Sequence, residues 1–183
     1  MQHNNQHITQ LLRECKNGKQ SAQFEIYKLY YKAMYNTAVR ILKDSFEAED
    51  VMQESFLIAF EKLSTFKAEV SFGAWLKRIV INKSITHLRK KSKIKEVPLD
   101  VVKEQTDESI EDTNYEALSP KEIISGINKL KDNYRIALTL NLIEGYDYEE
   151  ISEIMMITNQ NSRTTISRAK NKLRTLLKTD YAR

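Results

Sequence analysis

The sequence is poor in the residues that break or cross-link a chain. It contains 4 glycines, 2 prolines and 1 cysteine among 183 residues. So few glycines and prolines argue against a turn-rich all-β fold. The single cysteine, Cys15, has no partner for an internal disulfide, which fits a reducing compartment. The longest apolar run, residues 56–60, is far shorter than the roughly 20 residues of a membrane-spanning helix. The first six residues also lack the apolar core of a secretory signal, so we expect a helical, cytoplasmic protein.

Charge divides the chain into three segments. Residues 1–93 carry 16 basic and 9 acidic residues, and residues 119–183 carry 11 and 8. Between them, residues 94–118 carry 2 basic and 8 acidic residues, a composition that buries too little apolar surface to fold. The sequence therefore predicts an all-α protein of two small helical domains, residues 8–93 and 119–180. An acidic flexible linker over residues 94–118 would join them.

Local signals place several helix ends. The apolar spacing of residues 46–63 predicts one helix, and Gly145 stands where a helix ending near Ile143 needs a left-handed residue. Three pairs fit helix N-terminal caps: Asp44 with Glu47, Ser119 with Glu122, and Asp147 with Glu150.

The carboxy-terminal end has the layout of a helix-turn-helix. A short helix is predicted over residues 147–156 and a longer one over residues 159–178. Met156 stands at the turn position where glycine is usual, so we expect the turn to form at some backbone cost. Opposite an apolar stripe, the longer helix carries polar and basic side chains that suit base edges and phosphates; a solvated face is the alternative. The candidate DNA-binding residues are Asn161, Arg163, Thr164, Ser167, Arg168, Lys170, Asn171 and Lys172.

A second candidate for nucleic-acid binding begins at residue 66. Residues 77–95 include eight basic residues and no acidic one, and aromatic residues precede them. Rings interleaved with cations suit the unstacked bases of single-stranded nucleic acid; the alternative is that the rings belong to the core. The candidate residues are Phe66, Lys67, Phe72, Trp75, Arg78, Asn82 and Arg89.

The predicted helix over residues 46–63 carries the opposite charge. Glu47, Asp50 and Glu54 share one face because they are spaced by three and four residues, and Gln53 lies beside them. No lysine or arginine of this helix precedes Lys62. We therefore expect an uncompensated acidic face that binds a protein partner of basic character; a solvated face is again the alternative.

Signals for catalysis are weak. Ser64 and Lys67 match the Ser-x-x-Lys element of serine β-lactamases, but the other elements of that family are absent. The three histidines lack metal-ligand spacing, and a lone cysteine makes no zinc site. We expect no catalytic residue, metal, cofactor or small-molecule substrate.

Longer motifs resemble one protein family. Residues 50–56, DVMQESF, and residues 72–82, FGAWLKRIVIN, resemble region two of bacterial extracytoplasmic-function (ECF) sigma factors. Residues 144–151, EGYDYEEI, and residues 167–170, SRAK, resemble region four of the same family. The two sets of motifs occur in the family's order and separation, which is more specific than either set alone.

The resemblance implies a transcription initiation factor and not an enzyme. Such a protein binds the clamp helices and flap of core RNA polymerase, and directs the polymerase to promoter DNA. Region two melts and reads the minus-ten element, which would involve the candidates between Phe66 and Arg89. Region four reads the minus-thirty-five element, which would involve those between Asn161 and Lys172. The acidic face would contact the clamp helices.

The family usually has an anti-sigma factor, which can be membrane-bound, so the resemblance also implies such a partner. The main alternative is a conventional helix-turn-helix regulator. That alternative explains the carboxy-terminal half and leaves the acidic face and the aromatic segment without a role.

Overall fold

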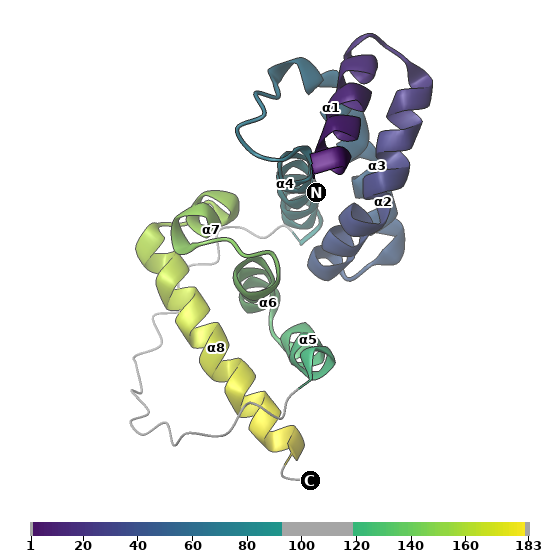
Figure 1. The fold of residues 1–183 in the computed structure, drawn as a ribbon. Coiled ribbons are helices and arrows are strands. Elements are labelled where there is room, and N and C mark those ends of the chain that lie inside the picture. Colours follow the sequence, from purple (N-terminus) through teal and green to yellow (C-terminus); the bar gives the residue numbers. More distant parts are fainter. Residues whose placement is uncertain (1, 93–118, 182–183) are drawn as a thin grey trace. The chain divides into compact units, whose positions relative to one another are not determined.

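The computed structural model describes residues 2–92 and 119–181, and it describes side chains within residues 6–91 and 119–178. The chain divides into two compact units, Met1–Lys93 and Ile94–Arg183. Every regular element within the described ranges is a helix (Figure 1), which confirms the all-α prediction. The predicted acidic linker lies outside the described residues.

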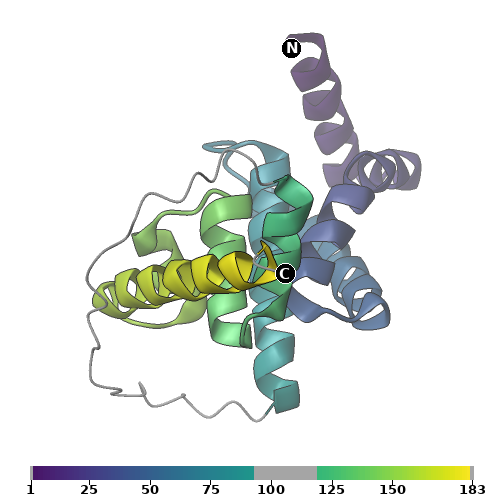
Figure 2. The same cartoon turned by 90° about the horizontal axis from the view of Figure 1, so that it is seen from below.

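The first unit is a bundle in which α2 (Gln20–Leu42), α3 (Ser45–Glu61) and α4 (Phe72–Ser92) all pack on one another. The helix α1 (Gln2–Lys16) packs on α2 and contacts the 3-10 turn η1 (Leu63–Thr65). Figure 2 shows α1 projecting from this bundle, with the amino terminus at its tip. Buried apolar side chains from all four helices form one core, among them Leu11, Ile26, Met52, Phe56 and Leu76.

Side-chain caps fix the starts of α3 and α4. Asp44 Oδ1 accepts hydrogen bonds from the amides of Phe46 and Glu47 at 2.9 and 3.0 Å, as predicted for this cap. Ser71 Oγ accepts from the amide of Ala74 at 3.2 Å at the start of α4. The helix predicted to reach residue 63 ends at Glu61, because the backbone tightens there into η1.

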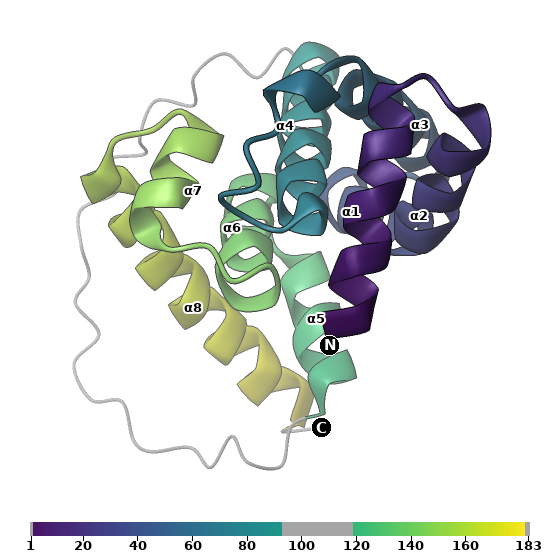
Figure 3. The ribbon, with the colours of Figure 1, turned by 45° about the horizontal axis from the view of Figure 1, so that its top comes forward.

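The second unit is arranged along its longest helix. It contains α5 (Pro120–Lys129), α6 (Asp132–Leu138), which continues into the π-helical turn η3 (Thr139–Ile143), then α7 (Tyr148–Met155) and α8 (Asn159–Tyr181). Helix α8 contacts α5, α6 and α7. Figure 3 shows α7 beside the start of α8 and α5 beside its far end.

Glycine allows the close contact between α5 and α8. A Cβ atom added to Gly126 would lie 2.7 Å from Leu173 Cδ1 and 3.2 Å from Leu177 Cδ2. Those distances are shorter than ordinary van der Waals contact, so a larger residue at position 126 would push the two helices apart or move the leucines. Gly126 therefore helps to fix the position of α8.

Three of the predicted local signals in the second unit are present. The capping box of Ser119 with Glu122 opens α5, and that of Asp147 with Glu150 opens α7; in each, both reciprocal hydrogen bonds are formed. Gly145 has φ +81° just after η3, as predicted for a left-handed position.

Met156 makes the turn between α7 and α8. Its φ of 50° and ψ of 47° are left-handed, and its side chain is 78% exposed. The amide of Met156 donates to the carbonyl of Glu153 at 3.2 Å, and the amide of Ile157 donates to that of Ser152 at 3.0 Å. This is a Schellman-type helix end, formed here without the glycine that usually occupies its left-handed position.

Candidate functional site

The predicted apolar stripe holds α8 against the rest of the second unit. Ile166, Ala169, Leu173 and Leu177 are buried, and Leu176 is half-buried. Because these residues face inward, the side chains on the opposite side of α8 face outward. The exposed members of the candidate DNA-binding set are Arg163, Ser167, Asn171 and Lys172, and the half-buried members are Asn161, Thr164, Arg168 and Lys170.

Two cations of that set lie against aromatic rings of other helices. The Arg163 guanidinium lies 5.3 Å from the centre of the Tyr148 ring, and its Nε donates to Asn159 Oδ1 at 2.9 Å. Lys172 Nζ lies 5.7 Å from the centre of the Tyr134 ring. Cation–π contacts of this kind restrict a long side chain. Sequence reasoning missed both rings, because they come from α6 and α7.

An aromatic cluster lies where the loop before α4 meets the start of that helix. The rings of Phe66 and Trp75 are 5.2 Å apart between centres, and each lies 5.7 Å from the ring of Phe72. Tyr30 of α2 meets Phe72 edge-on at 5.5 Å. Phe72 is only 4% exposed, so this ring belongs to the hydrophobic core, which was the alternative to a role in nucleic-acid binding. Phe66 and Trp75 are half-buried and lie at the surface of the cluster.

The polar candidates of the first unit lie on or near α4. Lys67 and Asn82 are exposed, whereas Arg78 and Arg89 are half-buried. Helix α4 has two buried apolar faces, with Leu76 and Val80 on one and Ile81 and Ile85 on the other. A polar strip between two buried faces therefore runs along α4.

The acidic face of α3 is not uncompensated, which corrects the expectation. Glu47 contacts Lys91 and lies 3.4 Å from His87 Nε2, and Glu54 Oε2 lies 2.7 Å from Lys83 Nζ. The hydrogen bond from Lys83 lowers the pKa of Glu54, and the hydrogen bond to Glu47 raises the pKa of Lys91. The cations come from α4, so the sequence of α3 alone gave no sign of them.

Asp50 and Gln53 remain on the outer side of α3, where both are exposed. Gln53 Nε2 donates to Glu49 Oε1 at 3.4 Å. Two large apolar residues lie on the same side: Phe46 is 81% exposed and Leu57 is 64% exposed. Sequence reasoning missed these two residues, although their spacing of four, three and four residues through Asp50 and Gln53 places all four side chains in one row.

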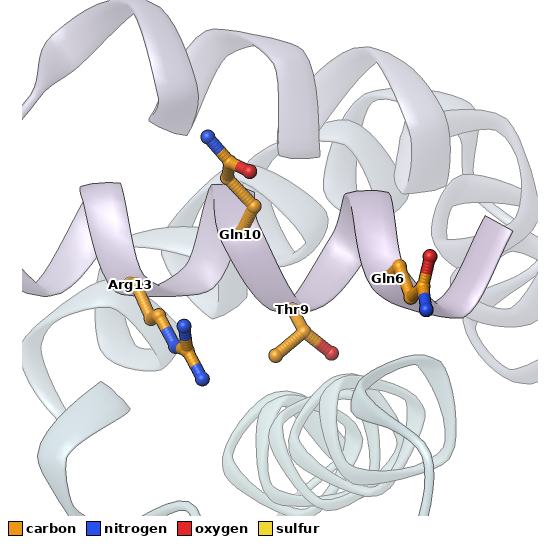
Figure 4. Close-up of a pocket in the computed structure, with 4 residues that line it drawn as sticks. All are labelled: Gln6, Thr9, Gln10 and Arg13. Carbon is orange, nitrogen blue, oxygen red and sulfur yellow. The ribbon is translucent and has the colours of Figure 1, made fainter. Parts of the chain in front are cut away.

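Support for catalysis is absent from the described residues. Ser64 and Lys67 are both exposed, and no hydrogen bond joins them among the described contacts. A shallow hollow on α1 is lined by Gln6, Thr9, Gln10 and Arg13 (Figure 4), which include no carboxylate, histidine or cysteine. No group of three potential metal-ligating residues occurs in the part of the chain that the structure describes. Within residues 2–92 and 119–181, no helix is both long and apolar enough to cross a bilayer.

Comparison with known proteins identifies the family. The sigma-70 region 2 model matches residues 26–94, and the sigma-70 region 4 model matches residues 120–173. The chain is 29% identical over 153 residues to the ECF RNA polymerase sigma factor SigM of Bacillus subtilis, covering 83% of this chain and 93% of that protein. It is 31% identical over 173 residues to the RNA polymerase sigma-H factor of Pseudomonas aeruginosa, covering 88% and 89%. The chain belongs to the ECF sigma factors.

As an ECF sigma factor, this protein binds RNA polymerase and directs promoter-specific initiation of transcription. Its fold is similar to that of the sigma factor RpoE of Bartonella quintana, solved with the anti-sigma factor NepR, with a TM-score of 0.56, 25% identity and coverage of 85% and 96%. CnrH, solved with the cytosolic domain of CnrY, shares the fold with a TM-score of 0.55, 22% identity and coverage of 93% and 96%.

Proposed function

We propose that this ECF sigma factor uses three separate surfaces to start transcription. The outer side of α3 binds the clamp helices of core RNA polymerase, the aromatic loop and α4 bind the minus-ten element, and the polar side of α8 reads the minus-thirty-five element. The observation that supports this division best is the charge of the first unit. Helix α3 contains no lysine or arginine, whereas residues 77–91 of α4 contain no acidic residue.

At the minus-ten element, we propose that Phe66 and Trp75 contact an unstacked base. Both rings are half-buried at the surface of the cluster, and base stacking on such rings contributes about 1–3 kcal/mol per base. Phe72 is buried and packs against both rings on the side of the core. The DNA strand that carries this base then lies along the polar side chains of the first unit: Lys67, the polar strip of Arg78 and Asn82, and Arg89 further along α4.

At the minus-thirty-five element, Ser167, Arg168 and Asn171 read base edges from the middle of α8. Arg163, Lys170 and Lys172 contact phosphates along the edges of the helix, and Asn161 and Thr164 lie nearer its start. The cation–π contacts of Arg163 and Lys172 support this assignment, because they hold two cations in place before DNA arrives.

We further propose that the protein acts in the cytoplasm without catalysing a reaction itself, and that an anti-sigma factor controls it. The anti-sigma proposal rests on the neighbouring structures, in which RpoE and CnrH are each bound to such a partner or to its cytosolic domain. We assign the contact with the polymerase flap to the second unit.

Run-off transcription tests the whole proposal. Purified protein and sigma-free core polymerase are incubated with a pool of genomic promoter fragments, and a known sigma factor serves as the positive control. We expect discrete transcripts that require this protein. Tight sequence-specific binding to duplex DNA without polymerase, combined with no transcripts, would instead favour the helix-turn-helix regulator.

Arg168→Ala tests the minus-thirty-five surface in the same assay. Loss of a bidentate contact to a base costs about 1–3 kcal/mol of discrimination, so the variant should lose preference at one promoter position. Lys178→Ala is the matched control, because Lys178 is an exposed cation in the last turn of the same helix. Equal promoter preference of both variants would remove Arg168 from the reading set.

A further inference from the structure

Four side chains form a continuous outer row on α3, which we call the α3 row: Phe46, Asp50, Gln53 and Leu57. Spacings of four, three and four residues put them on one side of the helix, over about 16 Å of its length at 1.5 Å per residue. Phe46 and Leu57 occupy the two ends, with exposed fractions of 81% and 64%. The row thus has apolar ends and a polar middle.

The exposure of Phe46 and Leu57 is not a consequence of a poor core. Met52 and Phe56, on the side of α3 that packs on the bundle, are only 2% exposed. The helix therefore already has a complete apolar face toward the bundle. Phe46 and Leu57 add apolar surface to the outer side of the same helix, eleven residues apart in one row, which indicates a second side that packs against a partner.

The ion pairs to α4 narrow the set of residues available to that partner. Glu47 and Glu54 are engaged by Lys91 and Lys83, and they hold α3 and α4 together. Asp50 is exposed and has no cation beside it among the described residues. The acidic contribution to binding therefore comes from Asp50 with the exposed Glu49 beside it, and from the exposed Glu61 about one turn beyond Leu57.

We infer that Phe46 and Leu57 are the apolar anchors by which this protein binds core RNA polymerase, with Asp50 and Gln53 between them. The inference rests on the proposed function of α3, keeps Asp50 and Gln53, and adds Phe46 and Leu57 as the residues that contribute most of the affinity. The polymerase surface that fits the α3 row has two apolar sites about 16 Å apart, flanked by lysine or arginine. Charge complementarity supports this occupant, because α3 has no basic residue and three of its acidic residues, Glu49, Asp50 and Glu61, are exposed outside the ion pairs to α4. Large apolar side chains that become fully desolvated in pockets of the partner usually dominate the affinity, whereas charges that stay solvated mainly set association rate and salt dependence.

The test measures the affinity of the full-length protein for purified core polymerase, at low and at high salt. Phe46→Ala and Leu57→Ala should each weaken binding about tenfold or more, by a factor that high salt does not reduce. Asp50→Asn should weaken binding at low salt and less so at high salt, because salt screens exposed charges. Thermal unfolding should be almost unchanged in all three variants, since the altered side chains are exposed.

Leu29→Ala is the matched control. Leu29 is 49% exposed on α2, two residues from Tyr27, whose ring contacts Phe56 of α3 at 4.9 Å. Two residues is more than half a helical turn, so Leu29 faces away from α3 and its loss should not affect binding.

The outcomes separate this inference from the proposed function. If the unaltered protein does not bind core polymerase, the proposed function itself is wrong. If it binds, and Asp50→Asn weakens binding while Phe46→Ala and Leu57→Ala do not, the proposed surface stands and the anchors are wrong. Equal losses in the anchor variants and in Leu29→Ala would also overturn the inference.

Discussion

Replacing Met156 by glycine should stabilise the second unit. A residue with a Cβ atom pays about 1–2 kcal/mol for the left-handed conformation, and Met156 adopts that conformation with φ 50° and ψ 47°. Glycine removes this cost but loses more backbone freedom on folding, which opposes the gain by about 0.5–1 kcal/mol. The side chain is 78% exposed, so little packing is lost. The net expectation is a gain of about 0.5–1 kcal/mol, or a few degrees in the unfolding temperature of a unit of this size.

Differential scanning calorimetry of Met156→Gly and Met156→Ala measures this effect. Alanine keeps the Cβ atom and hence the backbone cost, so Met156→Ala should unfold near the temperature of the unaltered protein. The only tryptophan, Trp75, lies in the first unit, and the temperature at which its fluorescence changes should be the same in both variants. If Met156→Gly and Met156→Ala have the same stability, the left-handed conformation carries no cost here and the reasoning is wrong.

Three further predictions concern packing, charge and the aromatic loop. Gly126→Ala should destabilise the second unit by about 1 kcal/mol. Crowding against Leu173 costs about 1–3 kcal/mol, and the higher helix propensity of alanine offsets about 1 kcal/mol of that cost. Higher thermal stability of the variant would show that the leucine moves aside easily. Lys83 lowers the pKa of Glu54 from its usual 4.5, so the stabilisation from this pair is complete above that value and is lost as pH falls through the lower folded pKa. The stability difference from Glu54→Gln should accordingly shrink at acidic pH, and a difference independent of pH would contradict the pairing. Binding of a single-stranded minus-ten oligonucleotide should change the fluorescence of Trp75; a bound oligonucleotide, detected by anisotropy, that leaves the emission unchanged would remove this ring from the contact.

Local features of the fold were predictable because their causes lie within one helical turn. The capping boxes at Ser119 and Asp147 need only residues three positions apart, and both form as expected. Gly145 likewise has the left-handed conformation that the end of a helix requires. The buried stripe of α8 follows from its own period, since Ile166 and Leu173 repeat at helical spacing.

Features that depend on contacts between helices were not predictable from one segment. Glu47 and Lys91 are 44 positions apart, so the acidic face looked uncompensated when α3 was considered alone. The burial of Phe72 and the partial exposure of Phe66 depend on Tyr30 and Trp75, which belong to different helices. The apolar ends of the α3 row were readable from spacing, but only burial distinguishes an outer row from an inner one.

Direct packing of α3 on α4 has a consequence for how such a factor positions DNA. The axes of packed helices lie about 8–10 Å apart, so if α3 contacts polymerase and α4 contacts the promoter, one interhelical spacing separates the enzyme from the strand that it opens. The two packed helices then set the distance between the polymerase surface and the promoter strand. Substitutions on either outer side can alter which polymerase or which promoter is bound, while the direct packing of α3 on α4 keeps that distance constant.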